Sequence, residues 1–302
     1  MKTQQNYVNP RIDTPNERGD AYDGNVSFDP VKAIWLGSMI LFGTVGSVLT
    51  ISVDAVLLFV FFTLITLCFG HSLGMHRRFI HRSYTCPKWM EYFFVHLGVL
   101  VGLAGPLGML KTHDMRDWAQ RQDQCHDFFA HGKWWMHDAY WQLFCSIELD
   151  KPPPFQPEAE IATDSVYAFM EKTWMLQQFP WALLFYLIGG WAWVFWGICS
   201  RVTVSVIGHW LIGYFAHNSG DRDWHVEGAA VQGFNIPFFA FLTMGESWHN
   251  NHHAFPGSAK LGLESNQIDP GWSVLLLLEK LGLVSDLVTP DALTDRTELV
   301  RL

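Results

Sequence analysis

The chain has 302 residues, of which 49% are hydrophobic and only 16% charged, whereas soluble domains carry about 25% charged residues. This composition favours a membrane protein over a soluble one. The net charge of −9 argues against nucleic acid as a partner, because such binding needs a basic face. The five cysteines include no CxxC pair, which argues against a thiolate zinc or iron–sulfur site and indicates a reducing compartment.

The polar N-terminal segment, residues 1–30, carries Pro, Asn and Asp and few apolar residues. Such a composition predicts a disordered lead, because it cannot bury enough apolar surface to fold. Residues 31–285 read as one membrane domain, and residues 286–302 as a loose C-terminal tail.

Four apolar runs follow the lead, and each is close to the ~20 residues that a helix needs to cross a bilayer. They cover 33–52, 54–70, 180–199 and 202–216. The runs of each pair are separated by only two residues or fewer, with Ser200 and Arg201 at the second turn. The pattern predicts an all-α integral membrane protein whose four transmembrane helices form two hairpins.

A fifth apolar stretch, residues 92–110, is long enough to span, but the distribution of positive charge argues against it. With four spans and both termini inside, Arg201 is the one residue among 20 Lys and Arg that lies outside, as the positive-inside rule requires. A fifth span would move several more to the outside. We therefore expect 92–110 to be in-plane or re-entrant, beneath a cytoplasmic helical cap, and the protein to lie in the inner membrane of a bacterium.

The densest histidine cluster is GESWHNNHHAFP, with His249, His252 and His253. Positions i, i+3 and i+4 share one face of a helix, so these imidazoles are expected to point together as metal ligands. The alternative is a set of solvated surface histidines.

The segment HSLGMHRRFIHRSY carries His71, His76 and His81. This is a weaker signal, because a five-residue spacing places two side chains about 140° apart on an α-helix. A later polar stretch holds four more histidines, which polar loops often collect: His113, His126, His131 and His137.

Two histidines belong to the last apolar run. His217 is at its inner mouth, and His209 lies well inside the predicted span, where ionisable groups are costly and usually functional. The alternative for His209 is a neutral imidazole bonded to a neighbouring helix.

These motifs resemble the membrane-bound fatty-acid desaturases, most closely the stearoyl-CoA (Δ9) branch, which has histidine boxes of the forms HxxxxH, HxxHH and HxxHH. The first box matches HRRFIHRSY, the third matches GESWHNNHHAFP, and FAHNSG matches a further family ligand at His217. The likeness covers about residues 33–285.

The second box departs from the family pattern, because it reads HDMRD. His113 matches its first position, but Arg116 and Asp117 stand where two histidines are expected. Arg116 cannot be a ligand, because its guanidinium stays protonated; we expect it to oppose the metal charge or to pair with Asp114 or Asp117. Asp117 can replace one histidine, since iron accepts mixed His/carboxylate sites.

A second departure is Gly213, which stands where the family has Asn. His209, extra relative to the family pattern and one turn away, is a candidate to compensate; His71 and His126 are lesser candidates. The predicted metal ligands are His76, His81, His113, His217, His249, His252, His253 and Asp117.

The resemblance implies two irons at the inner surface, O₂ as co-substrate, and an acyl chain held in a narrow tunnel among the spans. Family members remove two hydrogens from this chain to make a cis double bond. The altered second box also leaves open a site with one iron, or a degenerate one.

The need for an electron donor is indicated by cofactor motifs that the sequence does not contain. It shows no CxxCH haem site, no ferredoxin cysteine pattern and no GxGxxG fingerprint, so electrons are expected from a separate ferredoxin or cytochrome. Acyl-CoA, acyl carrier protein and phospholipid all remain possible carriers of the acyl chain. The alternatives to a desaturase are a hydroxylase on the same scaffold, a non-catalytic protein that binds metal or lipid, and a membrane haem protein.

Overall fold

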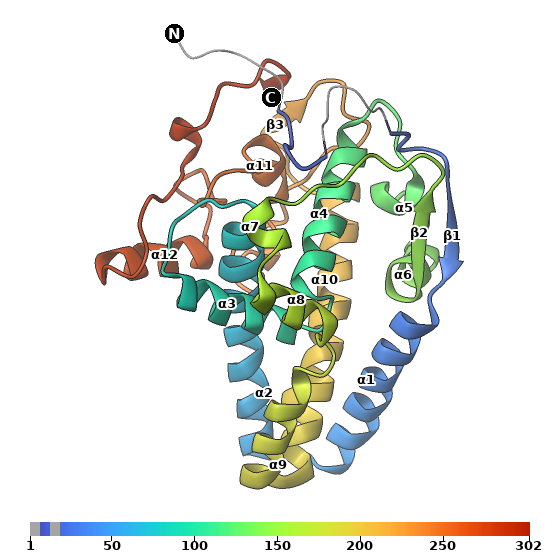
Figure 1. The fold of residues 1–302 in the computed structure, drawn as a ribbon, viewed down its shortest axis with the longest axis vertical. Coiled ribbons are helices and arrows are strands. Elements are labelled where there is room, and N and C mark those ends of the chain that lie inside the picture. Colours follow the sequence, from blue (N-terminus) through green and yellow to red (C-terminus); the bar gives the residue numbers. More distant parts are fainter. Residues whose placement is uncertain (1–6, 13–18) are drawn as a thin grey trace.

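The structure is a computed structural model that describes residues 7–12 and 19–302. The predictions for residues 1–6 and 13–18 of the N-terminal lead therefore lie outside the described residues. The molecule is mostly helical, with a narrow bundle of long helices below a broad cap (Figure 1).

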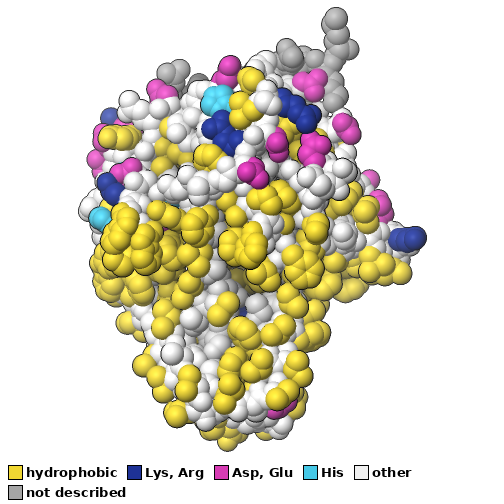
Figure 2. Space-filling view, turned by 180° about the vertical axis from the view of Figure 1, so that it is seen from behind, with side chains coloured by type: hydrophobic (Ala, Val, Ile, Leu, Met, Phe, Trp, Pro, Cys, Tyr) yellow, Lys and Arg dark blue, Asp and Glu magenta, His cyan; other side chains and the backbone are white. Residues whose placement is uncertain are grey.

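Among the described residues, three helical stretches are long and apolar enough to cross a membrane. They are α1 (Pro30–Leu49), α2 (Val53–Ile65) continued by the π-helix η1 (Thr66–Ile80), and α9 (Gln178–Val194) continued by the π-helix η2 (Phe195–Ser200) and α10 (Arg201–Asn218). Large apolar side chains point outward from them, such as Leu57, 64% exposed, and Leu187, 72% exposed. Figure 2 shows hydrophobic side chains over most of the narrow half, with most charged groups on the broad end.

Helices α1 and α2 each begin at a capping side chain. Asp29 accepts a hydrogen bond from the Lys32 amide at the start of α1, which has Pro30 in its first turn. Ser52 likewise caps α2 by accepting from the Ala55 amide. Both are preferred N-terminal arrangements, and Ser52 starts α2 directly after α1 ends at Leu49, so that the chain reverses at residues 50–52.

The third stretch reverses at Gly190 rather than at the predicted turn, Ser200–Arg201. Gly190 has φ +62°, a conformation that glycine adopts readily. Arg201 Nη2 donates to Gln178 Oε1 at 2.6 Å, although 23 residues of straight helix would separate them by about 34 Å. The predicted turn is therefore wrong. Arg201 lies buried within a helix, where it also donates to the carbonyls of Gly197 and Leu100.

The apolar stretch 92–110 is divided between α3 (Lys88–Leu100) and α4 (Pro106–Arg121), and in the described chain it forms no spanning helix. Helix α3 lies across the end of the bundle next to the cap (Figure 1) and packs closely on η1. A Cβ atom at Gly98 would lie 2.8 Å from the carbonyl oxygen of Gly70, so glycine permits this close contact.

The cap combines short helices with two small antiparallel sheets. Its further α-helices are α5 (Asp127–Ala130), α6 (Trp135–Phe144), α7 (Ala159–Ala162), α8 (Ser165–Lys172), α11 (His249–Ala254) and α12 (Pro270–Lys280). The 3₁₀ turns are η3 (Pro237–Phe239) and η4 (Pro290–Ala292). Strand β1 (Gly24–Phe28) pairs with β2 (Cys145–Leu149), and β3 (Trp224–Val226) pairs with β4 (Leu299–Arg301).

Both end segments pack on the cap, so the expected disorder of the lead and looseness of the tail are wrong for the described residues. In the lead, Ile12 is 1% exposed and β1 is part of a sheet. In the tail, Arg296 Nη1 donates to the carbonyls of His253 (2.7 Å) and Ala254 (2.9 Å), at the end of α11. Buried side chains in otherwise polar segments supply these contacts.

Candidate metal centre

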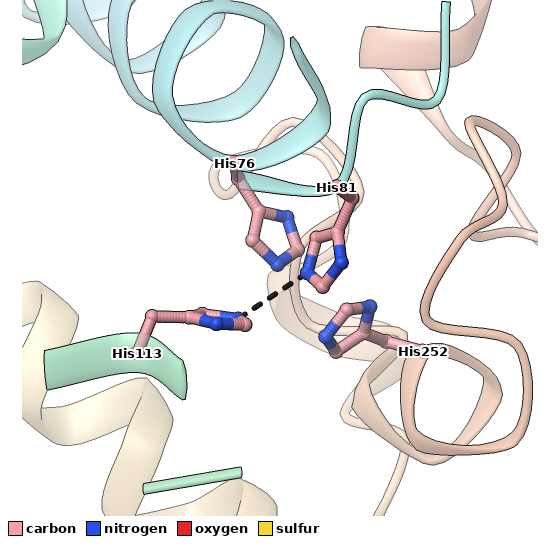
Figure 3. A group of neighbouring side chains, drawn as sticks. All are labelled: His76, His81, His113 and His252. Carbon is pink, nitrogen blue, oxygen red and sulfur yellow. Dashed lines mark hydrogen bonds between the residues drawn. The ribbon is translucent and has the colours of Figure 1, made fainter. Parts of the chain in front are cut away.

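Four histidines from three separate parts of the chain meet in one cluster (Figure 3). They are His76, His81, His113 and His252, and one ring nitrogen of each lies within 4.8 Å of the others. The closest approach is between His81 Nε2 and His113 Nε2, at 3.3 Å. We refer to this group as the four-histidine cluster.

A π-helix explains why the first box contributes two ligands. Its hydrogen bonds join residue i to residue i+5, and the amide of His81 donates to the carbonyl of His76 at 3.0 Å. Residues five apart therefore return to nearly the same face, and the two rings are 4.7 Å apart. The angle of about 140° expected from an α-helix is wrong here, because η1 is not an α-helix.

A second group, the three-histidine cluster, contains His217, His249 and His253. The Nε2 atom of His249 lies 3.1 Å from that of His217 and 3.0 Å from that of His253. His217 is at the end of α10, and the other two are on α11. The three ring nitrogens converge on one point.

Helix α11 joins the two clusters. Its i, i+3 and i+4 positions share a face, as predicted, but they serve different groups: His252 turns to the four-histidine cluster, and His249 and His253 to the three-histidine cluster. The ring centroids of His249 and His252 are 5.7 Å apart. The clusters are therefore neighbours, as a two-metal site requires.

The three histidines of α11 are in the protonation state that binds metal. Burial and neighbouring histidines lower the pKa values of His249 and His252 well below the usual range. Burial also lowers the pKa of His253 to about 4, against the opposing effect of Asp117. These imidazoles are neutral at pH 7, so a ring nitrogen lone pair is free to bind a cation.

Two carboxylates orient histidines of the four-histidine cluster. Glu246 Oε2 lies 2.6 Å from His76 Nδ1, and Asp114 Oδ1 lies 3.2 Å from His113 Nδ1. Although burial opposes ionisation, His76 and Arg77 hold the pKa of Glu246 at about 2, so it is a carboxylate. Such a partner fixes the tautomer and leaves Nε2 to face a metal.

Arg116 belongs to neither cluster and bonds His131 instead of a carboxylate of the second box. Its Nη1 lies 2.6 Å from His131 Nε2, and its Nη2 donates to Gln142 Oε1 at 2.7 Å. His131 Nδ1 in turn bonds Asp138 Oδ2 at 2.8 Å. The expected pairing of Arg116 with Asp114 or Asp117 is therefore wrong, because the guanidinium bonds His131 and Gln142 instead.

His131 occupies the space that Gly213 leaves. A Cβ atom at Gly213 would lie 3.2 Å from His131 Nε2, and the His131 ring stacks on His217 with centroids 5.6 Å apart. The sequence pattern predicts an ordinary loop histidine at His131, because the residues that contact it are distant in the chain. For the same reason the sequence does not indicate Asp138, which orients His131.

Asp117 lies beside the three-histidine cluster but outside it. Its Oδ2 is 3.3 Å from Arg121 Nε. Burial alone would raise the pKa of Asp117, but Arg121 and His253 hold it below its ordinary value. Asp117 is therefore a buried anion next to His253.

The other candidate histidines lie outside both clusters. The rings of His71 and His209 contact each other with centroids 5.0 Å apart, so His209 meets a histidine on a neighbouring helix. His126 caps α5 by accepting a hydrogen bond from the Phe128 amide, and its ring stacks on Trp141. Its role is structural.

The donor set fits two transition-metal ions. Two nitrogens that each lie about 2.1 Å from one ion can be at most about 4.2 Å apart, and the close Nε2 pairs, at 3.0–3.3 Å, satisfy this limit. Imidazole suits iron, zinc and copper. Seven buried or half-buried imidazoles in two adjacent groups can therefore hold two metals.

Comparisons with known proteins identify the family. The profile described as "Fatty acid desaturase" matches residues 54–263. An acyl-CoA C20 Δ5-desaturase of Anemone leveillei is 34% identical over 239 residues, covering 78% of this chain and 75% of that protein. An sn-1 stearoyl-lipid 9-desaturase of Anabaena variabilis is 36% identical over 222 residues, covering 74% and 79%. The chain therefore belongs to the fatty acid desaturase family, which confirms the resemblance found in the histidine boxes.

Proposed function

We propose that this protein is an O₂-dependent membrane desaturase that introduces a double bond into a fatty acyl chain at a diiron centre. The observation that carries the proposal is the meeting of seven histidines, distant in the chain, in two adjacent clusters at the inner end of an apolar helix bundle. The family membership supports the same reaction.

We place four membrane crossings in two hairpins, because the third long stretch folds back at Gly190. The two outer turns meet where Trp193 Nε1 donates to Asp54 Oδ2 at 2.6 Å. Residues 49–54 and 189–194 contain no Lys or Arg. This supports an orientation with the clusters and the cap in the cytoplasm, in a bacterial inner membrane.

Bound iron would supply the one-electron and O₂ chemistry that amino-acid side chains lack. The chain's own residues hold and orient the metal ligands: Glu246 acts on His76, and Asp114 on His113. Burial of the clusters keeps water from the reacting groups. Electrons would come from a separate ferredoxin or cytochrome that docks on the cap.

The substrate we propose is an acyl chain carried by CoA or by a membrane lipid. Relatives of both kinds support this: one is an acyl-CoA desaturase and another a stearoyl-lipid desaturase. Acyl carrier protein is the third carrier to test.

Turnover of the purified protein tests this function. Iron-loaded protein with ferredoxin and its reductase, or with a cytochrome donor, is supplied with acyl-CoA, acyl-phospholipid or acyl carrier protein. We expect a product two hydrogens lighter than one of these substrates. A product that gains oxygen would identify a hydroxylase, and no product with any carrier or donor would favour a non-catalytic protein.

Asp117 is predicted to supply a fourth ligand to the metal of the three-histidine cluster, since it is an ionised carboxylate beside His253. We expect Asp117→Ala to lower the iron content from about two to about one per chain, measured by elemental analysis of detergent-purified protein. The exposed Asp123→Ala, which removes the same charge, should retain both irons. Two irons in Asp117→Ala would exclude Asp117 as a required ligand.

A further inference from the structure

The guanidinium of Arg11, in the N-terminal lead, connects the first and second histidine boxes. Its Nη2 donates to the carbonyl of Ile80 at 2.9 Å, directly before His81. Its Nη1 donates to Asp114 Oδ2 at 3.0 Å, and the other oxygen of the same carboxylate bonds His113. Arg11 thus contacts the residue that orients His113 and the peptide that carries His81, the two histidines whose Nε2 atoms lie 3.3 Å apart.

The contacts of Arg11 are buried within the protein and are not those of a surface ion pair. The side chains of Arg11 and Asp114 are 7% and 1% exposed. Arg11 Nε also donates to Glu158 Oε2 at 2.9 Å, so all three nitrogens of the guanidinium donate a hydrogen bond. Its backbone is fixed too, because the Gln156 amide donates to the Arg11 carbonyl and Ile12 is buried in the cap core.

We propose that Arg11 is a positioning residue for the four-histidine cluster. It holds Asp114 so that His113 keeps the proton on Nδ1 and presents Nε2 to the metal, and it fixes the peptide that carries His81. The N-terminal lead is therefore part of the metal site. This inference rests on the proposed function only in that the four-histidine cluster binds a metal.

Lysine cannot replace this arginine. A guanidinium is a rigid fork that donates in several fixed directions, whereas an ammonium is a point charge on a flexible stem. Arg11→Lys can keep the charge near Asp114 but cannot hold the Ile80 carbonyl and Glu158 in the same geometry. We therefore expect the metal affinity of Arg11→Lys to be closer to that of Arg11→Gln than to that of the unchanged protein.

Cobalt binding to the full-length apoprotein tests the proposal without requiring turnover. Co²⁺ is titrated and its absorption bands are followed. We expect two binding events in the unchanged protein, and an affinity for one of them about tenfold weaker in Arg11→Gln, as is usual when an outer-shell partner of a ligand is lost. Asp114→Asn should weaken the same event, and the double variant should lose less than the sum of the two losses.

The matched control is Arg82→Gln, which removes another arginine that contacts Glu158, at 3.5 Å, but is 37% exposed. It should leave both affinities unchanged. A lower unfolding temperature of Arg11→Gln with both cobalt affinities intact would overturn the proposal, because it would show a role in stability alone. Absence of cobalt binding in the unchanged protein would instead contradict the proposed metal centre itself.

Discussion

Replacing His252 by alanine is expected to remove one of the two irons and to lower turnover at least about a hundredfold. His252 is the one residue of α11 that reaches the four-histidine cluster, with its ring centroid 4.5 Å from that of His76 and 4.8 Å from that of His81. Loss of an outer-shell partner already costs about 10- to 100-fold in affinity or activity, and the loss of a ligand should cost more.

Elemental analysis and turnover of the same preparation check this expectation. The matched control is His137→Ala, since His137 is exposed on α6 and belongs to neither cluster; it should keep both irons and the activity. Unchanged iron content and turnover in His252→Ala would mean that the four-histidine cluster is not a metal site.

Replacing Arg77 by methionine is expected to lower the free energy of unfolding by about 3–5 kcal/mol, because it leaves buried charges without their partner. Arg77 is 1% exposed. It pairs with Asp269 Oδ1 at 2.8 Å and with Glu246 Oε1 at 3.4 Å, and donates to the Ala259 carbonyl at 2.7 Å. Net stabilities are about 5–15 kcal/mol, so such a loss would deplete the folded protein.

Thermal unfolding in detergent measures this effect. Arg301→Met is the control, because Arg301 and its partner Glu264 are 64% and 47% exposed, and surface pairs contribute about 0–1 kcal/mol. The double variant with Asp269→Ala should lose less than the sum of the two single losses, since they share a contact. An Arg77→Met protein as stable as Arg301→Met would contradict the role given to this ion pair.

The spacing and order of the histidines match the family boxes, and on this basis the sequence predicts the seven histidines that meet in the two clusters. The sequence could not show that His76 and His81 share a face of one helix. This depends on the π-helix η1, and no residue pattern predicts its hydrogen bonds. The division of α11 between two clusters was also beyond the sequence, because it depends on where η1, α4 and α10 end in space.

Two other predictions are wrong because each places an arginine at the surface, whereas the fold surrounds it with hydrogen-bond partners. Arg201 was placed at an outer turn, but Gln178 and the Leu100 carbonyl hold it within the bundle. Arg11 was assigned to a disordered lead, but Asp114 and Glu158 hold it beside the histidines. Such partners are more than 20 residues away in the chain, so no local pattern indicates them.

The altered second box is accommodated by changes at distant positions. Arg116 bonds His131, and Gly213 leaves the space in which the His131 ring lies beside His217. Arg116 thus bonds an imidazole that stacks on His217, rather than a carboxylate of the second box. This arrangement favours a site that still holds two metals over a degenerate one.

The most direct test of a diiron centre is the iron content of the detergent-purified protein, measured together with its Mössbauer spectrum after growth on ⁵⁷Fe. We predict about two irons per chain, with signals from two distinct histidine-rich environments that correspond to the four-histidine and three-histidine clusters. One iron per chain, or zinc in place of iron, would contradict the diiron centre and leave the chain as a family member with altered chemistry.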